Sequence, residues 1–168
     1  GRVGQWGISH PGWYTAMGMI DAHPALKAAS PQATTGDPFI GDDAHRNGIY
    51  RLMPCMAWAY QQIAGTAPDR YDPSKIVVKP DFGTNWGYEY FLNAGPIDKI
   101  NETYFKGQLG SEWEDVMAHP NYDEYYQRRH IPKYMKNVLV PTLNVMGWFD
   151  APDPYGTIAT YQGIEKLS

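Results

Sequence analysis

The feature that most constrains the fold is a strand, a sharp turn, a helix and a second strand close to the start of the chain. Residues 3–8 (VGQWGI) read as a short buried strand, and residues 9–12 (SHPG) follow as a tight turn. Apolar residues then recur at helical spacing over 13–21, and residues 26–33 form a second candidate strand. This order predicts a βαβ unit, and therefore an α/β protein with a parallel sheet.

A third strand is predicted near the end of the chain. Residues 138–147 (VLVPTLNVMG) are apolar, rich in β-branched side chains and end in glycine, a combination typical of a strand. Residues 153–166 then have the pattern of a helix, with Asp150 or Asp153 near its start. The last part of the chain therefore returns to the α/β pattern.

The middle of the chain has a different composition. Pro, Gly, Asn, Asp and Tyr are dense over residues 36–135, and helical patterns replace strand alternation. Helices are predicted at 43–64, 84–94, 110–118 and 121–129, with a loop over 65–83. We therefore predict three parts: residues 1–42 and 136–168 form the core, and residues 43–135 form a helical insertion over the sheet.

Composition excludes several classes of function. The net charge is −4 and the short basic runs are scattered, so the sequence lacks a nucleic-acid footprint. No apolar run approaches the ~18 residues of a membrane span, and no leader peptide is visible. A single cysteine, Cys55, excludes an internal disulfide framework. No His/Asp/Glu cluster has metal-ligand spacing, so we expect neither a metal nor a cofactor.

The turn at Ser9 is the sharpest local signal for chemistry. A serine between a strand and a helix can occupy a strained elbow that lifts its hydroxyl above the sheet. The first N–H groups of the helix, beginning with that of His10, could then hold an oxyanion. The pattern is Gly-x-Ser-x-x-Gly, because Pro11 stands where Gly-x-Ser-x-Gly has its second glycine. A structural turn serine is the alternative that the pattern leaves open.

Residues 4–14 (GQWGISHPGWY) resemble the nucleophile elbow of the peptidase S15-type hydrolases. The resemblance continues in order through 21–27 (DAHPALK), 41–43 (GDD), 117–123 (MAHPNYD) and 147–156 (GWFDAPDPYG). This group contains cocaine esterase and X-prolyl dipeptidyl peptidase, and the pattern is closest to that of its α-amino-acid ester hydrolases and glutaryl acylase-like members. The resemblance therefore implies an α-amino acid ester hydrolase or an enzyme like the X-prolyl dipeptidyl peptidases. This resemblance implies a partial α/β-hydrolase core, a parallel sheet with a nucleophile elbow, carrying a helical cap insertion.

By the same resemblance, Ser9 attacks an ester or amide carbonyl and Asp150 is the acid of the triad. The His10 N–H is one oxyanion donor, although the family usually has tyrosine at this position. The catalytic histidine should follow the acid in the chain, yet no histidine follows His130. We therefore expect an internal fragment that carries two of the three triad residues. We expect structural roles for the histidines in the middle of the chain, His23, His45, His119 and His130.

The α-amino-acid ester hydrolases bind the ammonium group of the substrate through three carboxylates. Two of these positions correspond to Asp43 and Asp153, and the third falls on Pro152, which carries no charge. Helix capping is an alternative role for both aspartates. Trp148 is expected either to shape the pocket beside Asp150 or to pack against the sheet.

These observations predict a serine hydrolase acting on a small ester, an amide or a short peptide. A homo-oligomer is compatible with the sequence, and no compartment is assigned. The first alternative is a non-catalytic binding module that keeps the α/β-hydrolase fold. A second alternative, a carbohydrate-binding domain, follows from the 13 Tyr and 6 Trp residues, but such domains are usually antiparallel β.

Overall fold

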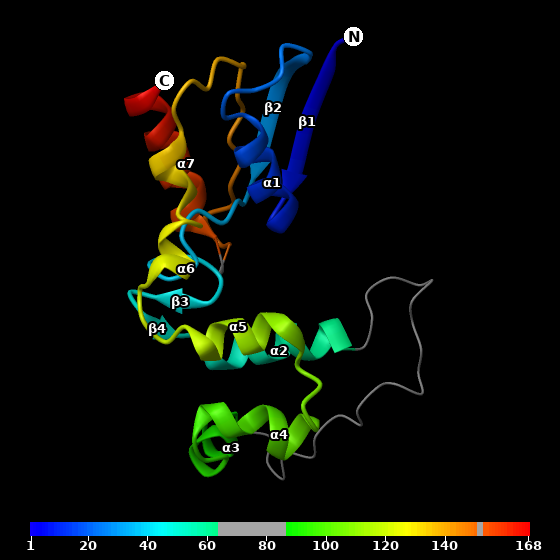
Figure 1. Cartoon of the computed structure of the whole chain (residues 1–168), viewed down its shortest axis with the longest axis vertical. Coiled ribbons are helices and arrows are strands. Elements are labelled where there is room, and N and C mark those ends of the chain that lie inside the picture. Colours follow the sequence, from blue (N-terminus) through cyan, green and yellow to red (C-terminus); the bar gives the residue numbers. More distant parts are fainter. Residues whose placement is uncertain (64–86, 151–152) are drawn as a thin grey trace. The chain divides into compact units, whose positions relative to one another are not determined.

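The computed structural model describes residues 1–63, 87–150 and 153–168. The described residues form two compact units, Gly1–Arg51 with Asn121–Ser168, and Leu52–Pro120 (Figure 1). The loop predicted over 65–83 lies outside the described residues. The predicted boundaries of the insertion, at 43 and 135, stay a prediction. None of the described helices combines the length and the apolar character needed to cross a membrane.

The first unit contains the parallel sheet and the helices that pack on it. Its elements are β1 (Val3–Ile8), α1 (His10–Gly18), β2 (Leu26–Gln32), β3 (His45–Arg46), β4 (Ile49–Tyr50), α6 (Glu124–Gln127), the 3-10 helix η3 (Ile131–Tyr134) and α7 (Pro154–Leu167). The second unit contains α2 (Leu52–Ile63), α3 (Gly87–Asn93), the 3-10 helix η2 (Ile97–Lys99), α4 (Ile100–Phe105) and α5 (Gly110–Ala118).

The predicted βαβ unit is present at the start of the chain. Strands β1 and β2 pair in parallel, with Trp6 opposite Ser30 and Ile8 opposite Gln32. Helix α1 connects them and lies beside both strands (Figure 1). A parallel pair requires such a crossover, so the local order of the sequence determines this part of the topology.

The predicted third strand is present only as isolated parallel bridges to β2, at Thr142 and Val145. The Leu143 N–H donates to the Ala29 carbonyl at 3.0 Å, and the Val145 N–H donates to the Pro31 carbonyl at 3.2 Å. Between these two bonds the ladder is broken because Pro31 has no N–H. The Leu143 carbonyl accepts instead from the Ser30 hydroxyl at 2.9 Å. The prediction of a regular strand over 138–147 was therefore wrong, although the segment follows β2.

The core of the first unit lies on the α1 side of the sheet. Its buried side chains come from α1 and the residue after it, from β2, from η3 and from the segment after η3: Ala16, Met19, Ala29, Ile131, Met135 and Val138. The α7 residue Ile164 packs against this cluster. The other face of the sheet exposes apolar side chains, among them Trp6 at 68% and Leu143 at 65%.

A hairpin replaces the start of the predicted 43–64 helix. Strands β3 and β4 are antiparallel, and the two residues between them, Asn47 and Gly48, have φ values of 48° and 81°. Asn-Gly with positive φ at both positions is the preferred two-residue hairpin turn. Helix α2 therefore begins only at Leu52, and this part of the helix prediction was wrong.

The second unit is helical in the part that the structure describes. Helices α2 and α5 pack together, and its core includes Met56, Tyr90, Ile100, Phe105 and Trp113. With the first unit, this makes a mixed α/β protein with a small parallel sheet.

Candidate functional site

Ser9 lies at the junction of β1 and α1 in a strained backbone conformation. Its φ is 61° and its ψ is −123°, a region that costs a non-glycine residue about 1–3 kcal/mol. The Ser9 N–H donates to the carbonyl of Gln32 at the end of β2, at 2.9 Å. A serine at a helix start usually caps it, yet among the described residues its hydroxyl forms no capping hydrogen bond. Ser9 is exposed, so its hydroxyl is available for another role.

Two glycines make the elbow sterically possible. A Cβ at Gly7 would lie 2.3 Å from the Pro11 carbonyl oxygen, and a Cβ at Gly12 would lie 2.6 Å from the Gln32 carbonyl oxygen. Real Cβ atoms do not approach backbone oxygens this closely, so both positions require glycine. His10 opens α1, and the first N–H groups of a helix have no intrahelical acceptor. The His10 N–H is therefore a possible donor beside Ser9.

Asp150 follows the bridged segment that lies along β2. Its N–H donates to the Gly147 carbonyl at 3.0 Å, and its Oδ1 accepts the Asp153 N–H at 3.3 Å. The segment before Asp150 and strand β1 flank β2 on its two sides, and all three run in parallel. Ser9 and Asp150 therefore both follow the carboxyl ends of the strands, the edge where active sites of such sheets form.

The structure brings Asp43 and Asp153 together, with Thr35 between them. The Thr35 hydroxyl donates to Asp43 Oδ2 at 2.7 Å and lies 3.4 Å from Asp153 Oδ1. The Asp43 N–H also donates to that oxygen, at 3.5 Å. Asp153 is 1% exposed, whereas Asp43 is open to solvent. Burial, followed by the nearby carboxylates, raises the pKa of Asp153 to about 8.

Asp42 is a buried residue to which the sequence assigned no role. Its Oδ2 accepts the N–H groups of Gly36 and Asp37, both at 2.8 Å. Its Oδ1 accepts the Gly156 N–H, in the first turn of α7, at 2.7 Å. Burial raises its pKa to about 6, although these hydrogen bonds oppose the shift. The GDD run was visible in the sequence, but the distant partner at 156 was not.

A second network missed by the sequence centres on Asp37. This fully buried carboxylate accepts from the N–H groups of Phe39 and Ile40 and from the Tyr122 hydroxyl at 3.0 Å. His130 Nδ1 lies 2.6 Å from the same oxygen, Oδ2. Burial would raise the pKa of Asp37, but the hydrogen bond with His130 and those from the backbone lower it below its usual value. These hydrogen bonds connect residues 37–40 to the segment around α6.

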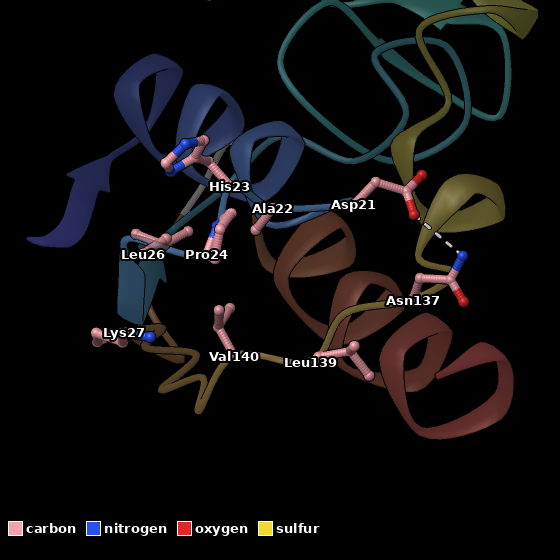
Figure 2. A pocket seen from close by; sticks show the side chains of 9 residues that line it. All are labelled: Asp21, Ala22, His23, Pro24, Leu26, Lys27, Asn137, Leu139 and Val140. Atoms are coloured by element: carbon pink, nitrogen blue, oxygen red, sulfur yellow. Dashed lines mark hydrogen bonds between the residues drawn. The ribbon is translucent and has the colours of Figure 1, made fainter. Parts of the chain in front are cut away.

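The predicted pocket residue Trp148 is 83% exposed. A cavity of about 520 Å³ lies elsewhere in this unit, where β2 begins and residues 137–140 approach it (Figure 2). It is lined by Asp21, Ala22, His23, Pro24, Leu26, Lys27, Asn137, Leu139 and Val140. The Asn137 amide donates to Asp21 Oδ1 at 3.0 Å across it. This end of β2 is opposite to the one that approaches Ser9, so the cavity is distinct from the candidate site.

The fold and the elbow define part of an α/β-hydrolase core. The sequence model of the X-Pro dipeptidyl-peptidase (S15) family matches residues 1–168, and the chain belongs to this family of hydrolases. The resemblance to the peptidase S15-type hydrolases is therefore confirmed. A comparison with curated proteins finds no match.

Several solved structures match the chain, and two of them are similar to almost all of it. One is an aminopeptidase from the marine sediment archaeon Thaumarchaeota archaeon, with 30% identity and a TM-score of 0.80. The other is an α-amino acid ester hydrolase labelled with selenomethionine, with 27% identity and a TM-score of 0.78. Each match covers 98% of this chain and 26% of the other chain. The chain therefore spans about a quarter of the length of these relatives.

Proposed function

We propose that this chain supplies the nucleophile and the acid of a serine hydrolase that cleaves ester or amide bonds. Ser9 is the nucleophile, Asp150 is the acid, and the histidine lies outside residues 1–168. The observation that carries the proposal is the Ser9 backbone, whose φ of 61° holds an uncapped hydroxyl at the carboxyl end of β1 among the described residues. A serine that serves only to begin a helix needs neither feature.

The reaction follows from these positions. Ser9 Oγ gives its proton to the histidine and attacks the carbonyl carbon, and the negative charge moves to the carbonyl oxygen. The His10 N–H donates to that oxygen at the start of α1. Asp150 holds the histidine in the required tautomer and stabilises it once it is protonated. The protonated histidine then gives its proton to the leaving group, and water hydrolyses the acyl-enzyme.

We extend the proposal to substrates that carry a free α-amino group. The two structural relatives are an aminopeptidase and an α-amino acid ester hydrolase. Asp43 and Asp153 supply two carboxyl groups for an ammonium ion, and Thr35 contacts both. Residue 152, where the third carboxylate would stand, is a proline outside the described residues. In this proposal the side chain of Trp148 lies beside the substrate.

Labelling of the complete enzyme with a fluorophosphonate tests the proposal. The label should attach to Ser9, as located by mass spectrometry, and Ser9→Ala should remove both labelling and hydrolysis of p-nitrophenyl acetate. Asp150→Asn should leave the fold intact and lower kcat by about 10³–10⁴-fold, because it disturbs the histidine tautomer. Labelling of a different serine would contradict the assignment. If the wild type showed no labelling and no hydrolysis, the result would favour the alternative, a non-catalytic binding module.

A further inference from the structure

We infer that Asp42 is a positioning residue that holds the acid-bearing segment in place for catalysis. Its carboxylate connects the loop after β2 to the first turn of α7, which directly follows the segment carrying Asp150 and Asp153. This inference rests on the proposed function, because it assigns Asp42 to the support of the proposed acid. Asp42 itself does not contact the reacting atoms.

Both oxygens of Asp42 are used, and they bind backbone on two different segments. One oxygen accepts from Gly36 and Asp37, and the other accepts from Gly156. The Asp42 residue is 0% exposed, so water does not compete for these three donors. Because both sides of the connection are backbone, the size of one carboxyl group sets the distance between the loop and α7.

The loop and α7 also approach each other too closely for side chains to separate them. A Cβ at Gly156 would lie 2.2 Å from both the Gly36 nitrogen and the Thr34 carbonyl oxygen. The Thr34 N–H donates to the Thr157 hydroxyl at 3.0 Å. A Cβ at Gly41 would lie 2.3 Å from the ring of Tyr155, the residue before Gly156. A small change in the Asp42 contact therefore displaces the beginning of α7.

The same loop is anchored to the nucleophile at its other end. The loop begins after Gln32, whose carbonyl accepts the Ser9 N–H at 2.9 Å. On the other side, Asp150 accepts the N–H of Asp153, which immediately precedes α7. The loop thus connects Ser9 to the acid-bearing segment, and Asp42 closes the connection. Displacement of α7 would move Asp150 away from the position that a shared histidine requires.

Substitution of Asp42 by asparagine removes the hydrogen bond to α7 while it keeps those to the loop. At pH 8 the Asp42 carboxyl, with a pKa of about 6, is ionised and both oxygens accept. In Asp42→Asn the single oxygen can still accept from Gly36 and Asp37, but the amide NH₂ then faces the Gly156 N–H. Two donors cannot pair, so this change breaks the α7 side and preserves the size of the side chain.

Kinetics of the complete enzyme at pH 8 test the inference against a matched control. Asp42→Asn should lower kcat for p-nitrophenyl acetate by about 10-fold or more and change KM by less than about 3-fold, because a displaced acid impairs the chemical step. The control is Asp37→Asn, a fully buried carboxylate of the same loop that binds Phe39, Ile40 and the α6 segment. It should lower the melting temperature but leave kcat within about 2-fold. Equal losses of kcat in the two variants would overturn the inference.

Hydrogen exchange gives a readout that does not depend on the proposed reaction. Amide exchange at Gly156 should accelerate by about 10-fold or more in Asp42→Asn and stay unchanged in Asp37→Asn, because only the first loses the acceptor of that N–H. Unchanged exchange at Gly156 would overturn the inference even if activity falls. Absence of hydrolysis in the wild type would contradict the proposed function, but it would not affect the hydrogen-exchange test of the contact between Asp42 and α7.

A milder variant covers the case in which Asp42→Asn does not fold. Thr157→Val removes the acceptor of the Thr34 N–H and leaves the Asp42 contacts in place. It should lower kcat by about 3-fold with KM unchanged, because it loosens the same junction. A folded Thr157→Val enzyme with faster amide exchange at Gly156 but an unchanged kcat would overturn the inference, because α7 would then be loosened without any effect on the acid.

Discussion

The Ser9 elbow and the carboxylate cluster at Asp43 and Asp153 differ in where their energetic cost lies. At the elbow the cost is conformational, a positive φ held by close backbone contacts with Pro11 in the same turn and with Gln32 at the end of β2. At the cluster the cost is electrostatic, a buried carboxyl group beside a second one from a distant segment. The first can be read from a short stretch of sequence, whereas the second exists only after folding. The comparison predicts that changes at the elbow affect all substrates and changes at the cluster affect selected ones.

Gly7→Ala is the strongest test of the elbow. The new Cβ would lie 2.3 Å from the Pro11 carbonyl oxygen, so the backbone that carries Ser9 must move. We expect kcat/KM of the complete enzyme to fall by about 100-fold or more for every ester tested, since a misplacement of about 1 Å has this effect. Gly4→Ala on the same strand is the control, because its Cβ meets the Ala28 carbonyl oxygen at an ordinary 3.7 Å. Similar activity in the two variants would contradict the steric account.

Asp153→Asn tests the substrate role of the cluster. An ammonium ion in the site would keep Asp153 ionised, because a nearby positive charge lowers the pKa of about 8 that this carboxyl has without it. Asparagine cannot ionise, so kcat/KM for α-amino acid esters should fall by about 10–100-fold, as expected for the loss of a charge-assisted contact. The value for p-nitrophenyl acetate should stay within about 3-fold, because this ester has no ammonium group. Steady-state kinetics with both esters gives the ratio directly. Equal losses on both would count against an ammonium site.

The same variant should stabilise the protein at high pH. The pKa of Asp153 is raised to about 8 in the folded state from 3.8, so ionisation opposes folding as the pH rises through that window. The stability of the wild type should therefore decline between about pH 4 and pH 8, and Asp153→Asn should remove part of that decline. We expect a gain of about 2 kcal/mol at pH 9, measured by urea unfolding at pH 5 and 9. Asp98→Asn, which removes a carboxylate at an exposed position, is the matched control.

Thr35 gives a smaller and more selective effect. Its hydroxyl donates to Asp43 and lies 3.4 Å from Asp153 Oδ1. Thr35→Val keeps the shape and removes the hydroxyl, and we expect the preference for α-amino esters over acetyl esters to fall by about 5-fold. Thr35→Ser, which retains the hydroxyl, should restore the preference. Loss of the preference in both variants would assign the effect to packing.

The parts of the fold that the sequence predicted are those set by neighbours in the chain. Strand β1, the turn at Ser9 and strand β2 follow from hydrophobic pattern and turn residues, and the structure has them. The broken pairing beside Pro31 and the junction at Asp42 were missed. The bond from Gly156 to Asp42 spans 114 residues, and a side chain that binds distant backbone leaves no periodic signal. The resemblance placed Asp43 and Asp153 in one site, and the structure brings them together while their function stays a prediction.

The smallest expected effect separates the strain at Ser9 from its chemistry. Ser9→Ala and Ser9→Gly both remove the hydroxyl, so both should be inactive, but only glycine adopts a φ of 61° without a steric penalty. If the elbow stores conformational energy, Ser9→Gly should be more stable than Ser9→Ala by about 1 kcal/mol. The loss of chain entropy on folding a glycine reduces this gain, so the comparison is made between the two variants by urea unfolding at one pH. A less stable Ser9→Gly would show that the packing around Gly7 and Gly12 has already relieved the strain, and the cost of the elbow would then lie in those contacts.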